Sequence, residues 1–330
     1  MLSEQVHLQN DIYYLKDYSA LYLNGGDSIY EYEYCEGQKR IVFRSIKRLI
    51  HQVAGTALDE PLYDLESQYG YGGPLTNDYS HDFLLRAFDA YKKKCIEEKI
   101  VSEFIRFHPF NQLGDFDFLY DFHSKEREVV IVDLLSDVEE RWKRYSKTTR
   151  NILRKTSCKL IRSANVISIQ QFQALYNKTM DKNQAGDFYY FGDDYFEHLS
   201  AIAGVDLLAV SLADEIVSCG YFMHSGDLAH YHLSANNADY IKENGNYELL
   251  DFAFDHAKAK GCKYMMLGGG RTSAIDDPLF QFKAKFSPVS LPFYISGVDF
   301  MPEKKQQLNK MWDAKHPERN LRLFQKYRAE

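Results

Sequence analysis

One order of secondary structure occurs twice in this chain, and this repetition restricts the fold more than any other feature of the sequence. In the first half, two β-prone runs at 28–50 form a hairpin pattern, and a glycine-rich turn at 69–75, a helical pattern and a strand follow. In the second half, three strand runs at 206–237 precede a helix and another strand. Two copies of one order predict an α/β (α+β) protein of two tandem domains, each a mixed central sheet flanked by helices.

The two expected helices are defined by apolar residues at helical spacing. In the first copy these are Leu84, Ala87, Phe88, Tyr91 and Cys95. In the second copy the helix opens at Asn244-Gly245-Asn246 and stops at Gly261, and its apolar face carries Tyr247, Leu250, Ala253, Phe254 and Ala257.

The segment between the copies sets the expected domain boundary. A strand ending near residue 135 precedes one long helix that reaches Lys159, and a second helical pattern follows. We place the boundary near Ser136, which gives domains at 1–135 and 136–330, the second with a partly helical C-terminal tail.

Composition limits the classes of partner. The chain has 330 residues, 45% of them hydrophobic, and a formal net charge of −7, so a surface that coats DNA is not expected. Its five cysteines are far apart in the sequence, so we expect them to be reduced thiols. The N-terminus lacks the pattern of a signal peptide and no segment is apolar for long enough to span a bilayer, so we expect a cytoplasmic protein without a transmembrane segment.

A basic segment lies between the two copies. From Arg141 to Lys159 there are eight basic residues and no acidic ones, and Lys143, Lys147, Arg150 and Arg154 recur at helical spacing. This stripe is either a solvated helix face or a dock for a phosphate, and the sequence favours neither.

The turn Asn244-Gly245-Asn246 opens a helix, where free backbone N–H groups favour a pyrophosphate such as that of coenzyme A. A simple helix cap is the more common meaning of such a turn. Glu248 in the first helical turn would repel a bound phosphate.

Two polar side chains alternate with apolar ones in the strand at 103–109. Arg106 and His108 share one face, and Arg106 can hold a carboxylate or phosphate in bidentate fashion. The structural alternative, which the pattern favours slightly, is an ion pair for Arg106 between domains and a strand end at His108.

The triplet His230-Tyr231-His232 is not expected to bind a metal, because strand alternation separates Tyr231 from its two neighbours and no third ligand is suitably spaced. Tyr231 and His232 would enter one pocket only through a β-bulge. The sequence also lacks a motif for a covalent nucleophile.

The segment 267–287 combines three glycines with Arg271, Lys283 and Lys285 among aromatic residues. Three successive glycines after an apolar strand have little value for packing and permit close backbone approach, so we favour a functional site here over a structural hairpin with exposed lysines.

Five motifs together resemble the FemAB-like branch of the GNAT acyltransferase superfamily, which includes the peptidoglycan-bridge aminoacyltransferases. They are YGYGGPL at 69–75, EFIRFHP at 103–109, TRNILRK at 149–155, YHLSANN at 231–237, and LGGG with DPLFQFKAKFS at 267–287. The resemblance covers nearly the whole chain.

The resemblance implies two GNAT-like domains around a cleft and transfer of an activated acyl group to an amine of a cell-envelope precursor. Phe282-Lys283 matches the catalytic Phe-Lys pair of the peptidoglycan branch, so Lys283 inherits the stabilisation of the oxyanion. Arg150 or Arg154 would bind a precursor phosphate, and the YGYGGPL match includes Tyr71 among the substrate-binding candidates. The general base is unassigned, and its candidates are Tyr231 and a carboxylate of the substrate.

The sequence departs from the family in two features that bear on the identity of the acyl donor. The long helical arm of some members is absent, and so is the Q/RxxGxG/A loop with which ordinary acetyltransferases hold coenzyme A. An acyl-CoA such as acetyl-CoA is the favoured donor and an aminoacyl-tRNA the alternative. A third hypothesis is a domain pair that binds a small-molecule or lipid-linked precursor without turnover, and a Lys283 closed off from solvent would favour it.

Overall fold

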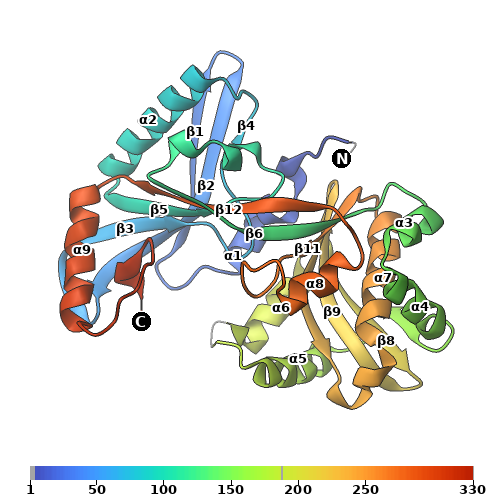
Figure 1. The fold of residues 1–330 in the computed structure, drawn as a ribbon. Coiled ribbons are helices and arrows are strands. Elements are labelled where there is room, and N and C mark those ends of the chain that lie inside the picture. The colour runs from blue at the N-terminus through green and yellow to red at the C-terminus, as the bar shows by residue number, and fades with distance from the viewer. Residues whose placement is uncertain (1–3, 187–188, 330) are drawn as a thin grey trace. The chain divides into compact units, whose positions relative to one another are not determined.

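The structure is a computed structural model that describes residues 4–186 and 189–329. Contacts divide the chain into two compact units (Figure 1). Unit 1 consists of Met1–Leu21 and Arg127–Leu291, and unit 2 consists of Tyr22–Glu126 and Pro292–Glu330. Each unit is a mixed sheet flanked by helices, as the repeated order predicts.

Unit 2 contains the first copy of that order. Its strands are β1 (Ser28–Glu36), β2 (Lys39–Val53), β3 (Thr56–Glu66), the short β4 (Leu75–Thr76), β5 (Ile100–Arg106) and β12 (Ser290–Asp299). Its helices are α2 (His81–Glu97), α9 (Pro302–Lys315) and the 3₁₀ turns Gln112–Asp115, Asp117–Leu119 and Lys326–Arg328. The order is β1-β2-β3-β5-β12, in which β3 and β5 are parallel because α2 connects them.

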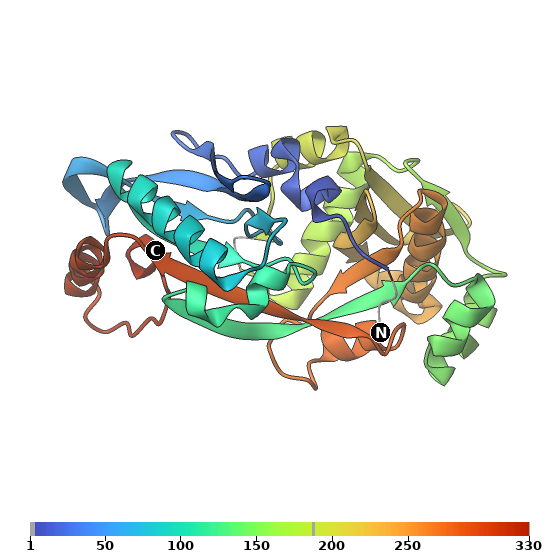
Figure 2. The same ribbon diagram turned by 90° about the horizontal axis from the view of Figure 1, so that it is seen from above.

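The helices of unit 2 cover its sheet with apolar side chains. The face of α2 predicted from the sequence is buried, and Tyr91 of α2 stacks on Phe43 of β2 with ring centroids 3.9 Å apart. Figure 2 shows α2, in cyan, lying along the strands of its own unit. Helix α9 contributes Leu308 and Trp312 to a second cluster with Ile50 and Val101.

Unit 1 contains the second copy. Its strands are β6 (Phe122–Asp133), β7 (Ile161–Ala164), β8 (Val205–Leu212), β9 (Glu215–Ser225), β10 (Leu228–Asn236) and β11 (Tyr264–Gly268). Its helices are α1 (Lys16–Ala20), α3 (Val138–Arg144), α4 (Lys147–Thr156), α5 (Ile169–Asn183), α6 (Asp193–Ala201), α7 (Gly245–Ala259) and α8 (Pro278–Ala284), with 3₁₀ turns at Leu8–Asn10, Ile12–Tyr14 and Ala238–Glu243. The order is β6-β11-β10-β9-β8-β7, with β10 and β11 parallel around α7.

Side-chain alternation along β9 gives each face of this sheet its own helices. Phe222 lies in the core cluster with Phe254 of α7, whereas the adjacent Tyr221 packs edge-on against Phe172 of α5 at 4.7 Å. The sheet is therefore covered on both faces, with α7 on the face that carries Phe222.

The strand that follows the helix in each copy, β5 or β11, pairs with a strand from outside that copy. β6 follows β5 in sequence but its residues 130–133 pair with β11 in unit 1, and β12 follows β11 but its residues 295–299 pair with β5 in unit 2. Each unit is consequently built from two segments. This division differs from the continuous domains 1–135 and 136–330, which stay a prediction.

The single long helix expected after β6 is wrong. Tyr145 has extended dihedral angles (φ −68°, ψ 150°) and ends α3, and the Ser146 side chain accepts a hydrogen bond from the Thr149 N–H to begin α4. The basic stripe is thus divided between two helices. Among the described residues, no helix combines the length and apolar character that crossing a bilayer requires.

Candidate functional site

Helix α8 places Lys283 in the interior of unit 1. Asp277 caps the helix and Pro278 occupies its first turn, a common start for a helix. Lys283 lies one residue before the helix ends, and its side chain is buried with 7% of its surface exposed. The alternative of a hairpin with exposed lysines is therefore wrong for this residue.

The glycine turn after β11 receives two cationic side chains. The Lys283 Nζ donates to the Gly269 carbonyl at 2.7 Å, and the Arg127 Nη1 donates to the Gly270 carbonyl at 2.8 Å. A Cβ atom on Gly269 would lie 2.7 Å from the Glu128 carbonyl oxygen, so a larger residue does not fit without movement. The glycines thus permit close packing of backbone and cations.

Burial changes the acid–base properties of Lys283. Loss of solvation, together with the nearby positive charge of Arg127, lowers the pKa of Lys283 to about 7. The carboxylate of Asp277 opposes this shift only partly. The Lys283 amine therefore changes its charge near neutral pH, which is a property of many catalytic lysines.

Asp277 organises the other end of the turn. Its carboxylate accepts hydrogen bonds from the N–H groups of Arg271, Thr272, Leu279 and Phe280 at 2.9–3.1 Å. Burial opposes ionisation, but these hydrogen bonds hold the pKa of Asp277 at about 2.

Replacing Asp277 by alanine should lower the free energy of unfolding by about 1–2 kcal/mol, because the cap of α8 and the closure of the turn are both lost. A carboxyl group with a depressed pKa contributes stability that is lost as the pH falls through its folded pKa, so the difference should shrink below pH 4. Thermal denaturation measures the effect, and Asp276→Ala at the exposed neighbouring position is the control. Equal stability of the two variants would contradict the role of Asp277.

Tyr231 faces the Lys283 amine from strand β10. The Lys283 Nζ lies 5.7 Å from the centre of the Tyr231 ring, which stacks on Phe222. Burial raises the pKa of Tyr231, although a hydrogen bond to Ser234 opposes this effect. Tyr231 is therefore a neutral phenol at physiological pH.

A β-bulge interrupts β10 at His232, since Tyr231 pairs with Phe222 and Leu233 with Tyr221. The extra residue of such a bulge is left unpaired in the ladder. Burial and the charge of His230 lower the pKa of His232 to about 3, so its ring is neutral and lies 2.9 Å from the Tyr195 hydroxyl.

Phe282 connects α8 to the first turn of α7. Its ring packs edge-on against Tyr247 with centroids 5.1 Å apart, and Lys285 donates to the Tyr247 hydroxyl at 3.2 Å. The Lys285 carbonyl accepts from the Ser146 N–H that precedes α4. The structure thus brings Lys283, Phe282 and Tyr231 into one region with the starts of α4 and α7.

The start of α7 has the form expected from Asn244-Gly245-Asn246. Asn244 has a left-handed backbone (φ 55°) and its side chain donates to the Lys242 carbonyl rather than capping the first turn. A Cβ on Gly245 would lie 2.5 Å from Val217, which explains the glycine. A pocket of about 230 Å³ adjoins this end of α7 and is lined by Thr148, Asn151, Ile152, Lys155, Thr156 and Asn244.

The charge of Glu248 is compensated in the structure. Arg162 donates to the Glu248 carboxylate at 2.7 Å, and Thr156 donates to its other oxygen. The repulsion of a phosphate expected from Glu248 is therefore reduced by an adjacent cation.

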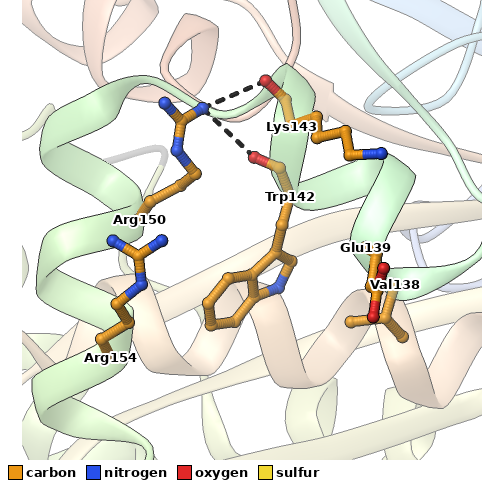
Figure 3. A pocket seen from close by; sticks show the side chains of 6 residues that line it. All are labelled: Val138, Glu139, Trp142, Lys143, Arg150 and Arg154. Carbon is orange, nitrogen blue, oxygen red and sulfur yellow. Dashed lines mark hydrogen bonds between the residues drawn. The ribbon is translucent and has the colours of Figure 1, made fainter.

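A second pocket of about 570 Å³ lies between α3 and α4 (Figure 3). Val138, Glu139, Trp142, Lys143, Arg150 and Arg154 line it. Figure 3 shows Arg150 and Arg154 on successive turns of α4, with both guanidinium groups directed towards α3 and the indole ring of Trp142 beside them.

The two arginines have different roles in this pocket. Arg150 Nη1 donates to the Tyr145 carbonyl at 2.6 Å and the Lys143 carbonyl at 3.1 Å, so it binds the C-terminal end of α3. Arg154 is exposed and contacts Asn151 of its own helix at 3.2 Å. Lys143 pairs with Glu140. Arg154 is thus the member of the stripe best placed to bind an anion.

Three candidates lie in unit 2. Arg106 pairs with Glu66 at 2.6 Å, which is an ion pair within this unit rather than one between domains. The strand β5 ends at Arg106, so the alternation does not extend to the buried His108. The ring of Tyr71 packs edge-on against His108 at 5.5 Å and Phe293 at 5.3 Å.

Arg271 lies in unit 1 on the exposed part of the glycine turn, where its N–H rather than its guanidinium binds Asp277. Two site residues were missed from the sequence. The Asp277-Pro278 pair is a helix-start signal that could have identified Asp277. No local signal identifies Arg127, because its role depends on the position of a turn that lies 143 residues away.

Comparison with known proteins supplies a family for part of the chain. Residues 137–283 match the family model of the acetyltransferase (GNAT) domain. No curated protein matches the chain in sequence.

Solved structures resemble almost the whole chain. The crystal structure of FemX has a TM-score of 0.67 at 14% identity and covers 91% of this chain and 94% of its own. The C-terminal domain of a putative lysylphosphatidylglycerol synthetase from Agrobacterium fabrum has a TM-score of 0.52 at 16% identity, with coverages of 86% and 88%. At these identities the likeness shows a shared fold, and with the domain match it confirms the resemblance to FemAB-like GNAT proteins.

Proposed function

We propose that this acyltransferase acts in the cytoplasm on an amine of a cell-envelope sugar or peptidoglycan precursor, either small or lipid-linked. The match of residues 137–283 to the acetyltransferase (GNAT) domain supports the acyl transfer. The favoured donor is an acyl-CoA. The observation that carries the proposal is the buried Lys283 amine at the glycine turn, next to the bulge of β10.

Acyl transfer requires donors directed at the oxyanion that forms when the amine attacks the acyl carbonyl. The Lys283 ammonium and the N–H groups at the bulge near His232 supply such donors. In this mechanism the amine forms a C–N bond, the bond from the carbonyl carbon to the leaving group breaks, and the proton of the amine passes to solvent or to the leaving group. Tyr231, as a neutral phenol, is suited to donate the single proton that the leaving group takes; the proton of the amine then passes to solvent, and solvent returns a proton to Tyr231.

The start of α7 supports acyl-CoA as the donor. Backbone N–H groups in the first turn of a helix favour a pyrophosphate, and Asn244, Gly245 and Asn246 form that turn. Lys155 lines the adjoining pocket and adds a positive charge. The compensation of Glu248 by Arg162 removes the main objection to an anion here.

Release of free thiol from acetyl-CoA, in the presence of candidate amines of envelope precursors, tests the donor directly. Formation of an N-acetylated product with one thiol per acyl group supports the proposal. An enzyme that is inactive with acyl-CoA thioesters but transfers amino acids from aminoacyl-tRNA would establish the alternative donor.

The alternative has its own support. The chain shares its fold with FemX and with a synthetase whose name denotes lysine joined to a phospholipid. The exposed Arg154 and Lys155 on α4 offer a local positive surface for a tRNA on an acidic protein.

The third hypothesis, binding without turnover, is favoured by the burial of Lys283. A buried lysine is, however, also the usual form of a lysine whose pKa is tuned for catalysis. Absence of product with both donor classes, together with retained precursor binding, would establish the third hypothesis.

Charge reversal at Arg154 should weaken binding of a phosphorylated precursor by about 10-fold at low salt and leave the melting temperature nearly unchanged, because Arg154 is exposed. Calorimetric titration at two salt concentrations measures this. The variant for comparison is Arg150→Glu. Unlike Arg154→Glu, it should lower the melting temperature, because Arg150 binds the end of α3. If Arg154→Glu bound the precursor as well as the wild type at low salt, α4 would present only a solvated face.

A further inference from the structure

Three side chains converge on one point in unit 1 away from the glycine turn. Asp206 lies in β8, His224 in β9 and His256 in α7. The Nε2 atoms of both histidines lie close to the same Asp206 oxygen, Oδ2, at 2.9 Å for His224 and 2.7 Å for His256.

From this geometry we propose that Asp206, His224 and His256 form a binding site for a divalent transition-metal ion, with zinc as the best-matched metal. Two imidazole nitrogens and one carboxylate oxygen are a common three-residue ligand set for zinc, with a fourth position left for water. The three ligand atoms all lie within 4.8 Å of one another.

Both nitrogen–oxygen distances are close to those between the ligands of a coordinated ion. Zinc binds nitrogen and oxygen at about 2.0–2.2 Å, so tetrahedral ligand atoms are separated by about 3.3 Å. The two nitrogen–oxygen distances of 2.7 and 2.9 Å therefore need to lengthen by only about 0.5 Å.

The surroundings orient the carboxylate as an outer shell does in a metal site. Asn165 donates from Nδ2 to the second oxygen of Asp206 at 2.7 Å, and its own Oδ1 accepts from the Leu207 N–H. The side chains remain 11–19% exposed, so an ion can enter from solvent. The positive charge of Lys260, whose Nζ lies 3.9 Å from the Asp206 carboxylate, opposes the binding of a cation.

The alternative to a metal is a hydrogen-bonded cluster in which both histidines donate to Asp206. One feature favours an ion: the three ligands come from three different rigid elements, which suits a fixed coordination geometry.

The test uses the 330-residue protein, stripped of metal and titrated with zinc near pH 7.5. Mass spectrometry measures its metal content, and calorimetry measures the affinity. We expect one zinc per chain with a dissociation constant of about 1 µM or lower, and weaker binding near pH 5.5 because metal binding requires neutral imidazoles. Each of His224→Ala and His256→Ala should weaken binding at least about 10-fold. His81→Ala, at an exposed histidine beside Asp82, is the matched control.

Should the alanine variants fold poorly, Co²⁺ added to the wild type provides a second measurement, since a tetrahedral site gives intense visible absorption. Asp206→Asn should abolish that absorption while retaining a hydrogen-bond acceptor. Absence of stoichiometric zinc binding by the wild type, or binding unaffected by both histidine substitutions, would overturn the proposal.

Discussion

Replacing Lys283 by methionine should lower kcat by about 100-fold or more and change the KM for the acceptor little, because an oxyanion contact forms mainly in the transition state. Methionine retains an unbranched side chain, one atom shorter than that of lysine, and removes the charge. Steady-state kinetics measure both constants. A rise in KM with unchanged kcat would instead assign Lys283 to ground-state binding.

The pH dependence tells which form of Lys283 acts. Its pKa of about 7 means that the amine is charged below neutral pH and largely neutral above pH 8. If the ammonium stabilises the oxyanion, the ratio of wild-type kcat to that of Lys283→Arg should fall from pH 6 to pH 9, since arginine keeps its charge. A ratio that rises over the same range would make neutral Lys283 a general base.

The substitution Lys283→Met should also raise the stability of the protein. Because the folded pKa of Lys283 lies below the value of about 10.5 for an unfolded lysine, its burial destabilises the protein fully below pH 7, and the penalty declines as the pH rises towards 10.5. Lys283→Met should thus raise the free energy of unfolding at pH 7 by on the order of 2 kcal/mol. For the effect of Lys283→Met on kcat, the control is Lys285→Met, which should change kcat by less than about threefold. A loss of stability in Lys283→Met would contradict the penalty.

Periodicity in the sequence predicted the elements whose contacts are local. Helix α7 and the strands β8 to β10 follow from apolar spacing and turn residues. Strand β3 was not predicted because Pro61 and its acidic residues obscure the alternation. The break between α3 and α4 had a signal in Ser146, but the basic spacing that continues past it favoured one helix.

Other features depend on positions far apart in the chain. The pairing of β6 with β11 and of β12 with β5 is a choice between similar strands, which local patterns do not decide. Lys283 was identified through the family motif, whereas its altered pKa depends on Arg127 and on burial in the fold. The convergence of Asp206, His224 and His256 likewise follows no sequence spacing.

Replacing Arg162 by methionine should lower the free energy of unfolding by about 3–5 kcal/mol, because the substitution leaves buried carboxylates without their cation. Arg162 donates to Glu248 at 2.7 Å, to Asp251 at 2.9 Å and to Asp255 at 3.0 Å, all on one face of α7. The side chains of Glu248 and Asp251 are almost completely buried. Arg141 contacts Asp251 and Asp255, so it compensates part of the lost charge.

Chemical denaturation of the wild type, Arg162→Met and Arg144→Met measures this effect. Arg144 forms a more exposed pair with Asp133, so its substitution should cost less than about 1 kcal/mol. A deficit of Arg162→Met no larger than that of Arg144→Met would contradict the role of Arg162 in compensating the buried carboxylates of α7.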